Sequence, residues 1–96
     1  MFTLGIEHAI TDFRTWKTAF DRFADARRQA GVLAERIRRP IDDGQYLVIE
    51  LDFETKESAE AFQHFLTTVV WNNPDASPAL SGHPTTRVLQ SVSDSN

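Results

Sequence analysis

The spacing of the apolar residues changes near residue 12 from a period of two to a period of about 3.6, and this change restricts the fold more than any other feature of the sequence. Residues 2–10 alternate, with Leu4, Ile6 and Ile10 on one side, which is typical of a β-strand. The apolar residues that follow recur at three- and four-residue steps and form one broad stripe, as on a helix. They are Phe13, Trp16, Ala19, Phe20, Phe23 and Ala24.

Polar residues, glycine and proline mark the ends of two predicted helices. Asp12 occupies an N-cap position, and Gly31 is a natural C-terminal stop, so we expect one helix between them. Thr55 can cap a second helix, which ends near Asn73 because Pro74 disfavours helical geometry in the residue before it. The predicted buried residues of this second helix are Ala59, Phe62, Phe65, Leu66, Val69 and Val70.

The remaining segments predict three further strands. Residues 34–40 and 45–53 form a hairpin, and the Asp-Gly step of the turn Asp42-Asp43-Gly44 supplies a positive φ. Residues 72–84 form a long irregular loop before a last strand at 85–92. The strand at 45–53 divides into an apolar row and a mixed row: Leu47, Ile49, Leu51 and Phe53, opposed by Tyr46, Val48, Glu50 and Asp52.

The order β-α-β-β-α-β predicts an α+β, ferredoxin-like fold. Right-handed crossovers place both helices on the same face of a four-stranded antiparallel sheet. We expect residues 1–92 to form a single domain, with a frayed tail at 93–96. The face opposite the helices is then bare, and its mixed row suits a pocket wall or the seat of a partner.

Composition argues against several classes of protein. A net charge of −4 disfavours nucleic acid as the main partner. The absence of cysteine excludes disulfides and thiolate sites, and His8, His64 and His83 lack metal-ligand spacing, so we expect no metal. Because the chain has no 18-residue apolar run and no signal-peptide pattern, we expect no membrane segment and a cytoplasmic location.

Residues 8–31 contain a recognisable motif, in which a strand-end histidine precedes Asp-Phe-x-x-Trp-Lys-x-x-Phe-Asp. With further matches at 39–43, 60–62 and 76–82, the sequence resembles the dimeric α/β-barrel superfamily. The most similar branch holds short bacterial proteins without a single assigned reaction, related to the antibiotic-biosynthesis monooxygenases. The resemblance implies a homodimer packed sheet to sheet, with a small pocket between the helices and the sheet of each subunit. It implies no single chemistry.

The haem-degrading members of that superfamily use an asparagine on the first strand, a tryptophan on the second helix and a histidine beyond it. Here the second helix has Phe65 where the tryptophan is expected, and Asp75 stands ten residues further on. No asparagine occupies residues 2–10. The resemblance therefore does not extend to haem degradation, and we expect no cofactor.

His8 is the candidate catalytic residue. An imidazole whose ordinary pKa lies near 6.5 can take a proton from an activated carbon or a phenol. His8 shares its parity with the apolar residues of the first strand. The alternative is therefore a structural histidine, hydrogen-bonded at the strand end to the next helix or to the loop.

Two groups of residues are candidate ligand-binding sites. Tyr46, Glu50 and Arg38 can form a polar patch on the bare face of the sheet, and cross-strand ion pairing is the alternative. Trp71 and Asn72 can line the rim of a pocket covered by the loop that follows, or they simply begin a connecting loop. The aromatic residues of the helices are interpreted mainly as core.

These features together favour a small homodimer with a pocket for an apolar or aromatic metabolite. The enzymatic hypothesis is a cofactor-free monooxygenase or cyclase-like reaction, in which His8 or a pocket carboxylate takes the proton. The alternative is a non-catalytic dimer that binds a ligand or serves in a stress response. A buried His8 facing an enclosed cavity, with an arginine or tyrosine nearby, favours the enzyme.

Overall fold

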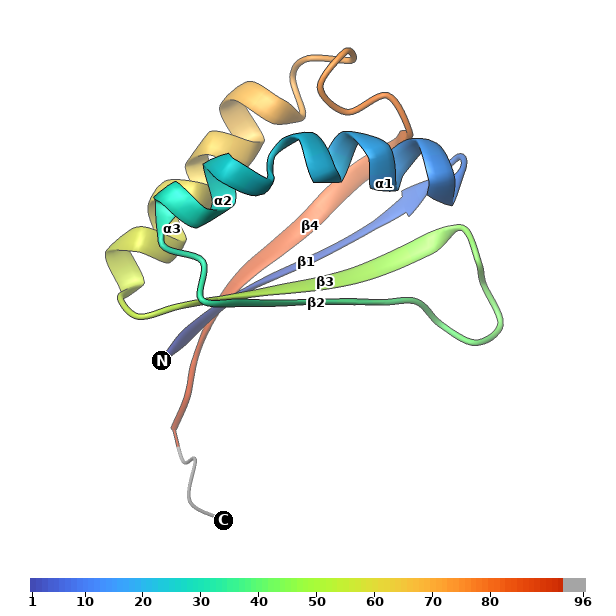
Figure 1. The fold of residues 1–96 in the computed structure, drawn as a ribbon. Coiled ribbons are helices and arrows are strands. Elements are labelled where there is room, and N and C mark those ends of the chain that lie inside the picture. Colours follow the sequence, from blue (N-terminus) through green and yellow to red (C-terminus); the bar gives the residue numbers. More distant parts are fainter. Residues whose placement is uncertain (93–96) are drawn as a thin grey trace.

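The computed structural model describes residues 1–92, and it has helices on one face of a four-stranded sheet (Figure 1). The elements in chain order are β1 (Phe2–Ile10), α1 (Phe13–Arg22), α2 (Ala24–Ala30), β2 (Ala34–Arg38), β3 (Tyr46–Phe53), α3 (Lys56–Phe65), the π-helical turn η1 (Leu66–Val70) and β4 (Leu80–Gln90). The strands lie in the order β2-β3-β1-β4, and all neighbours are antiparallel. The predicted α+β, ferredoxin-like fold is confirmed. The tail predicted at 93–96 lies outside the described residues.

The core lies between the helices and the apolar face of the sheet. Burial alternates along β3, where Leu47, Ile49, Leu51 and Phe53 are buried and the residues between them are partly exposed. On the neighbouring strand Leu4 pairs with Leu51, so the buried rows of β1 and β3 share one face. The division of β3 into an apolar and a mixed row is therefore as predicted. Within residues 1–92, no helix is long and apolar enough to cross a membrane.

The single helix predicted between Asp12 and Gly31 is two helices. Asp12 caps α1 by accepting a hydrogen bond from the backbone N–H of Thr15, and Gly31 ends α2 with a φ of 99°, as expected. The break falls at Phe23, whose N–H donates to the carbonyl of Phe20 at 3.1 Å, which tightens the last turn of α1. Apolar spacing did not reveal this break because the stripe continues across it.

The second predicted helix changes its winding after Phe65. In η1 the N–H of Trp71 donates to the carbonyl of Leu66 at 2.9 Å, five residues back, which is the hydrogen bond of a π-helix. The wider turn rotates the residues that follow, so Val70 is buried and Val69 is 49% exposed. The prediction that Val69 is buried was wrong for this reason.

The hairpin between β2 and β3 has a longer loop than predicted. β2 ends at Arg38 rather than residue 40, and the loop occupies residues 39–45. Gly44 does not have a positive φ, because only Gly31 and Gly82 do within the described chain. The tight Asp-Gly turn predicted at 42–44 was therefore wrong.

The last strand begins at Leu80, within the predicted loop 72–84, so the loop before it is shorter than expected. Glu7 on β1 pairs with Thr85 and Ala9 pairs with Ser81, which leaves residues 82–84 of β4 as a bulge opposite His8. Gly82 reaches its φ of 74° here. β4 lies at the edge of the sheet, where a bulge, a glycine and a proline are all tolerated. The glycine and proline in residues 82–84 are the reason that the sequence predicted a loop there.

A candidate functional site between the helices and the sheet

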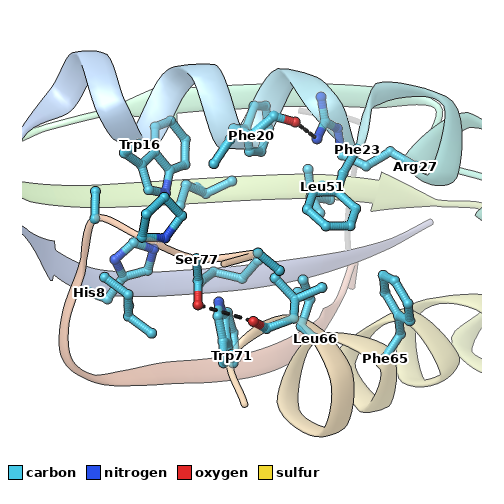
Figure 2. Close-up of a pocket in the computed structure, with 18 of the residues that line it drawn as sticks. His8, Trp16, Phe20, Phe23, Arg27, Leu51, Phe65, Leu66, Trp71 and Ser77 are labelled. Atoms are coloured by element: carbon cyan, nitrogen blue, oxygen red, sulfur yellow. Dashed lines mark hydrogen bonds between the residues drawn. The ribbon is translucent and has the colours of Figure 1, made fainter. Parts of the chain in front are cut away.

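A cavity of about 70 Å³ lies between the helical layer and the sheet, under the loop that joins η1 to β4. Its walls are mainly aromatic and aliphatic, and the side chains that can donate or accept hydrogen bonds are few. Figure 2 shows most of the lining residues. They are Ile6, His8, Trp16, Ala19, Phe20, Phe23, Arg27, Ile49, Leu51, Phe62, Phe65, Leu66, Val70, Trp71, Ala76, Ser77, Pro78, Ala79 and Leu80.

His8 enters this cavity from the helix-covered face of β1. It is 4% exposed, and it lies between two indole rings, with ring centroids 6.3 Å from Trp16 and 6.5 Å from Trp71. On one side it pairs with Leu47 of β3, and on the other it faces the bulge of β4. β-Bulges commonly re-aim side chains beside functional sites, and this one gives His8 surroundings unlike those of its neighbours on β1.

The hydrogen bonding of His8 defines its tautomer. Its Nδ1 lies 3.0 Å from the carbonyl oxygen of Ala9. Because a carbonyl oxygen only accepts, Nδ1 carries the proton and Nε2 presents a lone pair when the ring is neutral. Within residues 1–92, no fully buried side-chain nitrogen or oxygen lacks a partner. Nε2, which has no protein partner there, therefore has accessible surface, and the side chain that carries it lines the cavity.

Burial lowers the pKa of His8 from its ordinary value of 6.5, and the hydrogen bond to Ala9 opposes this effect only in part. The ring is therefore neutral at pH 7. A neutral imidazole with an available Nε2 is chemically able to accept a proton from a molecule in the cavity.

Trp16 and Phe20 form the wall that extends from His8 along α1. Their rings stack with centroids 4.7 Å apart, and Trp16 is 8% exposed, which confirms its predicted burial. The aromatic residues of the helices were interpreted mainly as core: Trp16 and Phe62 belong to it and Phe20 and Phe65 pack against it, whereas Phe13 is 37% exposed. Several of them also line the cavity. The sequence therefore did not distinguish residues that only fill the core from residues that line the cavity.

Arg27 of α2 is the charged residue at the other end of this wall (Figure 2), and sequence reasoning missed it. It is 5% exposed, and its Nε donates to the Glu35 carboxylate at 2.8 Å. Its Nη1 donates to the carbonyl of Phe20 at 2.6 Å, and its guanidinium lies 3.6 Å from the centre of the Phe20 ring. A signal was present, because Arg27 stands four residues after Phe23 and thus on the apolar stripe of the helix.

The loop over the cavity is held at its start by short-range bonds and at its end by a longer-range one, in which the N–H of Thr11 donates to the carbonyl of Ala79 at 2.9 Å. The hydroxyl of Ser77 donates to the carbonyl of Val70 at 3.0 Å, as Figure 2 shows. Trp71 contributes its ring to the cavity, as the prediction of a pocket rim at 71–72 implies. Asn72 is exposed, and its amide donates to the carbonyl of Thr68 at 3.2 Å. Asn72 does not line the cavity.

Tyr46, Glu50 and Arg38 lie on the opposite, open face of the sheet and do not meet His8. Arg38 donates to Glu50 at 2.6 Å, so these two side chains form the cross-strand ion pair that was the alternative to ligand binding. The Tyr46 hydroxyl donates to Glu7 at 3.0 Å, and this bond to a carboxylate raises the pKa of Tyr46.

Arg36 on the same face donates to both Glu50 and Asp52 and lowers the pKa of the Asp52 carboxyl. The open face thus carries paired charges of both signs. Within the described chain, no three histidine, aspartate or glutamate side chains are grouped so that they could hold a metal ion.

No family model and no curated protein matches this sequence. The chain is similar to the solved structure of SnoaB, a cofactor-independent oxygenase from Streptomyces nogalater, with a TM-score of 0.72 and 14% identity over 97% of this chain and 94% of that one. A dimeric ferredoxin-like protein from an uncultured marine organism has a TM-score of 0.66 and 16% identity, over 98% of this chain and 97% of that one.

A third structure is a mutant of MhuD with two manganese protoporphyrin IX molecules bound per active site. Its TM-score is 0.66 and its identity is 18%, over 98% of each chain. Similarity at these identities establishes the fold and leaves the reaction open. The structural neighbours of this chain are ferredoxin-like dimeric proteins and antibiotic biosynthesis monooxygenases, in agreement with the resemblance of residues 8–31.

Proposed function

We propose that this protein binds an apolar or aromatic metabolite in the cavity beneath α1 and that His8 acts there as a general base in a cofactor-independent oxygenation. The observation that carries the proposal is the environment of His8: a buried, neutral imidazole with an available Nε2, between Trp16 and Trp71. The similarity in fold to a cofactor-independent oxygenase supports the class of reaction.

The proposed reaction begins with transfer of a proton from an acidic C–H or O–H group of the bound molecule to Nε2 of His8. The electron pair stays on the substrate as a carbanion or phenolate, which reacts with dioxygen as the second substrate. For an activated methylene carbon, one oxygen atom enters the product as a carbonyl, and the other leaves as water with the two hydrogens of that carbon. The proton held by His8 is returned to that water, so the base is regenerated.

The cavity must widen before an aromatic metabolite can enter it. Its volume of about 70 Å³ is well below the several hundred Å³ typical of pockets for organic ligands. The segment proposed to move is the part of the loop at 71–78, because it covers the cavity and the Ser77 side chain bonds only to nearby backbone carbonyls. Ala79 stays in place, since it is buried and its carbonyl accepts the N–H of Thr11. In this proposal Trp71 moves with the loop and contacts the ligand.

The proposed assembly is a homodimer in which two sheets pack through their open faces. Similar structures are described as dimeric. The open face carries Arg36, Arg38 and Arg87 as well as Glu7, Glu50 and Asp52, and a surface with both signs of charge can face a copy of itself. Tyr46, Glu50 and Arg38 then belong to this interface. The proposed location is the cytoplasm.

The alternative proposal is a non-catalytic dimer that binds a ligand. The hydrogen bond between Nδ1 of His8 and the carbonyl of its neighbour Ala9 favours it, because a histidine held in this way can be purely structural. The two proposals differ in one respect, since only the enzyme consumes dioxygen when a ligand is bound.

The test is a screen of aromatic phenols and ketones with activated methylene groups, carried out on metal-free protein. Binding is followed by NMR at the two indole N–H signals, and turnover is followed as dioxygen uptake. Uptake that depends on His8 supports the enzyme, and binding without uptake supports the alternative. Haem is included as a separate arm, and activity seen only with haem or iron contradicts the cofactor-free proposal.

A further inference from the structure

We propose that Arg27 is the specificity-determining residue of the cavity, and that its guanidinium selects aromatic ligands that carry a neutral carbonyl oxygen. This inference rests on the proposed function in assuming that the cavity binds an aromatic molecule. It adds to that function a second polar group that binds the ligand, at the end of the cavity away from His8. The chemistry of this group then defines the chemical class of the ligand.

The first argument is position. In Figure 2 His8 and Arg27 stand at opposite ends of the cavity, with Trp16 and Phe20 between them. Each step along this wall is a direct ring contact, at 6.3 Å from His8 to Trp16, 4.7 Å from Trp16 to Phe20 and 3.6 Å from Phe20 to the guanidinium carbon of Arg27. The wall therefore has a base at one end and a donor at the other, and a flat molecule lying on the Phe20 half of it lies next to the donor.

The second argument is the donor capacity left in Arg27. A guanidinium has five N–H groups. Nε donates to Glu35 and Nη1 donates to the carbonyl of Phe20, while Nη2 has no protein partner within residues 1–92. No fully sealed side-chain nitrogen in that part of the chain is unpaired, and Arg27 is almost completely buried and lines the cavity. Nη2 is thus accessible and without a protein partner on a residue that lines a mainly apolar cavity, and we take it as the donor for a bound molecule.

The third argument is charge. The Glu35 carboxylate already balances the positive charge of Arg27 through an ion pair of 2.8 Å. A ligand carboxylate would bring a second negative charge next to Glu35 and would lose its hydration in an apolar cavity, both of which are unfavourable. A carbonyl oxygen accepts the free N–H groups without either cost. The Arg27–Glu35 ion pair therefore favours a ligand with a neutral ketone or quinone-type oxygen over a ligand with a carboxylate.

The test compares three naphthalenes of nearly equal shape: 2-acetylnaphthalene, 2-isopropenylnaphthalene, in which C=CH₂ replaces C=O, and 2-naphthoate. Dissociation constants come from NMR titration of the Trp16 and Trp71 indole signals. The ratio of ketone to hydrocarbon affinity is expected to be about 10-fold higher in the natural protein than in Arg27→Met, because a hydrogen bond to a charged donor is lost. The matched control is Arg28→Met on the same helix, where the side chain is exposed. It should keep the natural ratio.

Glu35→Gln provides a second test that keeps the guanidinium. With its charge no longer balanced, Arg27 should bind 2-naphthoate more tightly relative to the ketone than in the natural protein. An unchanged ratio in a folded Arg27→Met protein overturns the inference. If that variant does not fold, an unchanged naphthoate preference in Glu35→Gln overturns it instead. Failure of all three compounds to bind overturns the proposed function itself, whereas equal binding of ketone and hydrocarbon overturns only the role of Arg27.

Discussion

Arg27 donates a hydrogen bond of 2.6 Å to the carbonyl oxygen of Phe20, across the residue at which α1 ends and α2 begins. The same carbonyl accepts the N–H of Phe23 at 3.1 Å. A helix end leaves carbonyl groups without their usual partners, and a buried one needs a replacement donor. Arg27 supplies such a donor to the Phe20 carbonyl. The same side chain thus stabilises the end of α1 and lines the cavity.

Replacement of Trp16 by alanine is expected to reduce the free energy of unfolding by about 3–5 kcal/mol, because it removes a large, buried ring from between His8 and Phe20. Urea denaturation followed by circular dichroism measures the loss. Phe13→Ala is the matched control on the same helix, and it should cost clearly less because Phe13 is 37% exposed. A cost for Trp16→Ala below about 1 kcal/mol would contradict the packing described for α1.

For any substrate found, His8→Ala should lower turnover by about 10²- to 10⁴-fold, the usual contribution of a positioned general base. Folding should survive, because the hydrogen bond that His8 makes in the chain is to the adjacent residue Ala9. His64→Ala is the control, since His64 is exposed on α3 and does not line the cavity. Equal activity in His8→Ala would assign His8 a purely structural role.

The stability of the protein should depend on pH through His8. Its pKa is lowered on folding, so between the folded value and 6.5 the unfolded chain binds more protons than the folded chain. Stability therefore rises with pH in this window. We expect the contribution of His8 to be complete above pH 6.5 and to be lost as the pH falls from there through the folded pKa.

Denaturation between about pH 7 and about pH 5 measures this dependence, and His8→Gln should flatten it. The acid limb of any turnover profile should likewise have its midpoint below 6.5. The Asp52 carboxyl, whose pKa is lowered by Arg36, contributes in a separate, more acidic window, below 3.8. A midpoint of turnover above 6.5 would contradict the burial of His8.

The homodimer predicts a mass of twice 10.9 kDa at micromolar concentration in sedimentation equilibrium. A stable interface of this kind buries on the order of 800 Å² per subunit. Val48→Glu should weaken the dimer, because it adds a carboxylate beside Glu7 and near Glu50 on the open face. Val69→Glu, on the exposed side of η1, should not. A natural protein that is monomeric throughout this range would contradict the proposed assembly.

Two glycines provide a matched pair for backbone strain. Gly31→Ala should destabilise the protein by about 1–2 kcal/mol, because a Cβ is unfavourable at a φ of 99°. Gly44→Ala should be neutral or stabilising by about 0.4–1 kcal/mol, because its φ is not positive and no atom lies within 4 Å of the added Cβ. Thermal unfolding of both variants measures the difference. A large loss of stability in Gly44→Ala would instead support the tight Asp-Gly turn that the sequence predicted.

Local pattern was sufficient for the order of strands and helical segments and for the two faces of β3. Alternation along β3 correctly separated Leu51 and its row from Glu50 and its row. His8 shares its parity with Leu4 and Ile6 and is buried with them on the helix-covered face, which the sequence had left open. The position of Gly31 correctly marked a helix end with a positive φ. These predictions succeeded because each depends on the side-chain directions and backbone preferences of residues close together in the chain.

The features that make the cavity do not follow from apolar spacing. The break at Phe23 goes with a bond from the Arg27 side chain to the Phe20 carbonyl, and the bulge opposite His8 arises from the pairing of β4 with the distant strand β1. The π-helical turn that places Trp71 by the cavity is equally invisible in apolar spacing, which continues through it.

The sequence by itself therefore determined the order of elements, the two faces of the sheet and the burial of Trp16, since hydrophobic periodicity encodes them locally. Only the tertiary structure decided which polar groups share a site. It placed His8 and Arg27 at the two ends of one aromatic wall, and it paired Arg38 with Glu50 and Tyr46 with Glu7 on the open face. Periodicity reports whether a residue faces inward, whereas strand register and helix breaks fix which inward-facing residues meet.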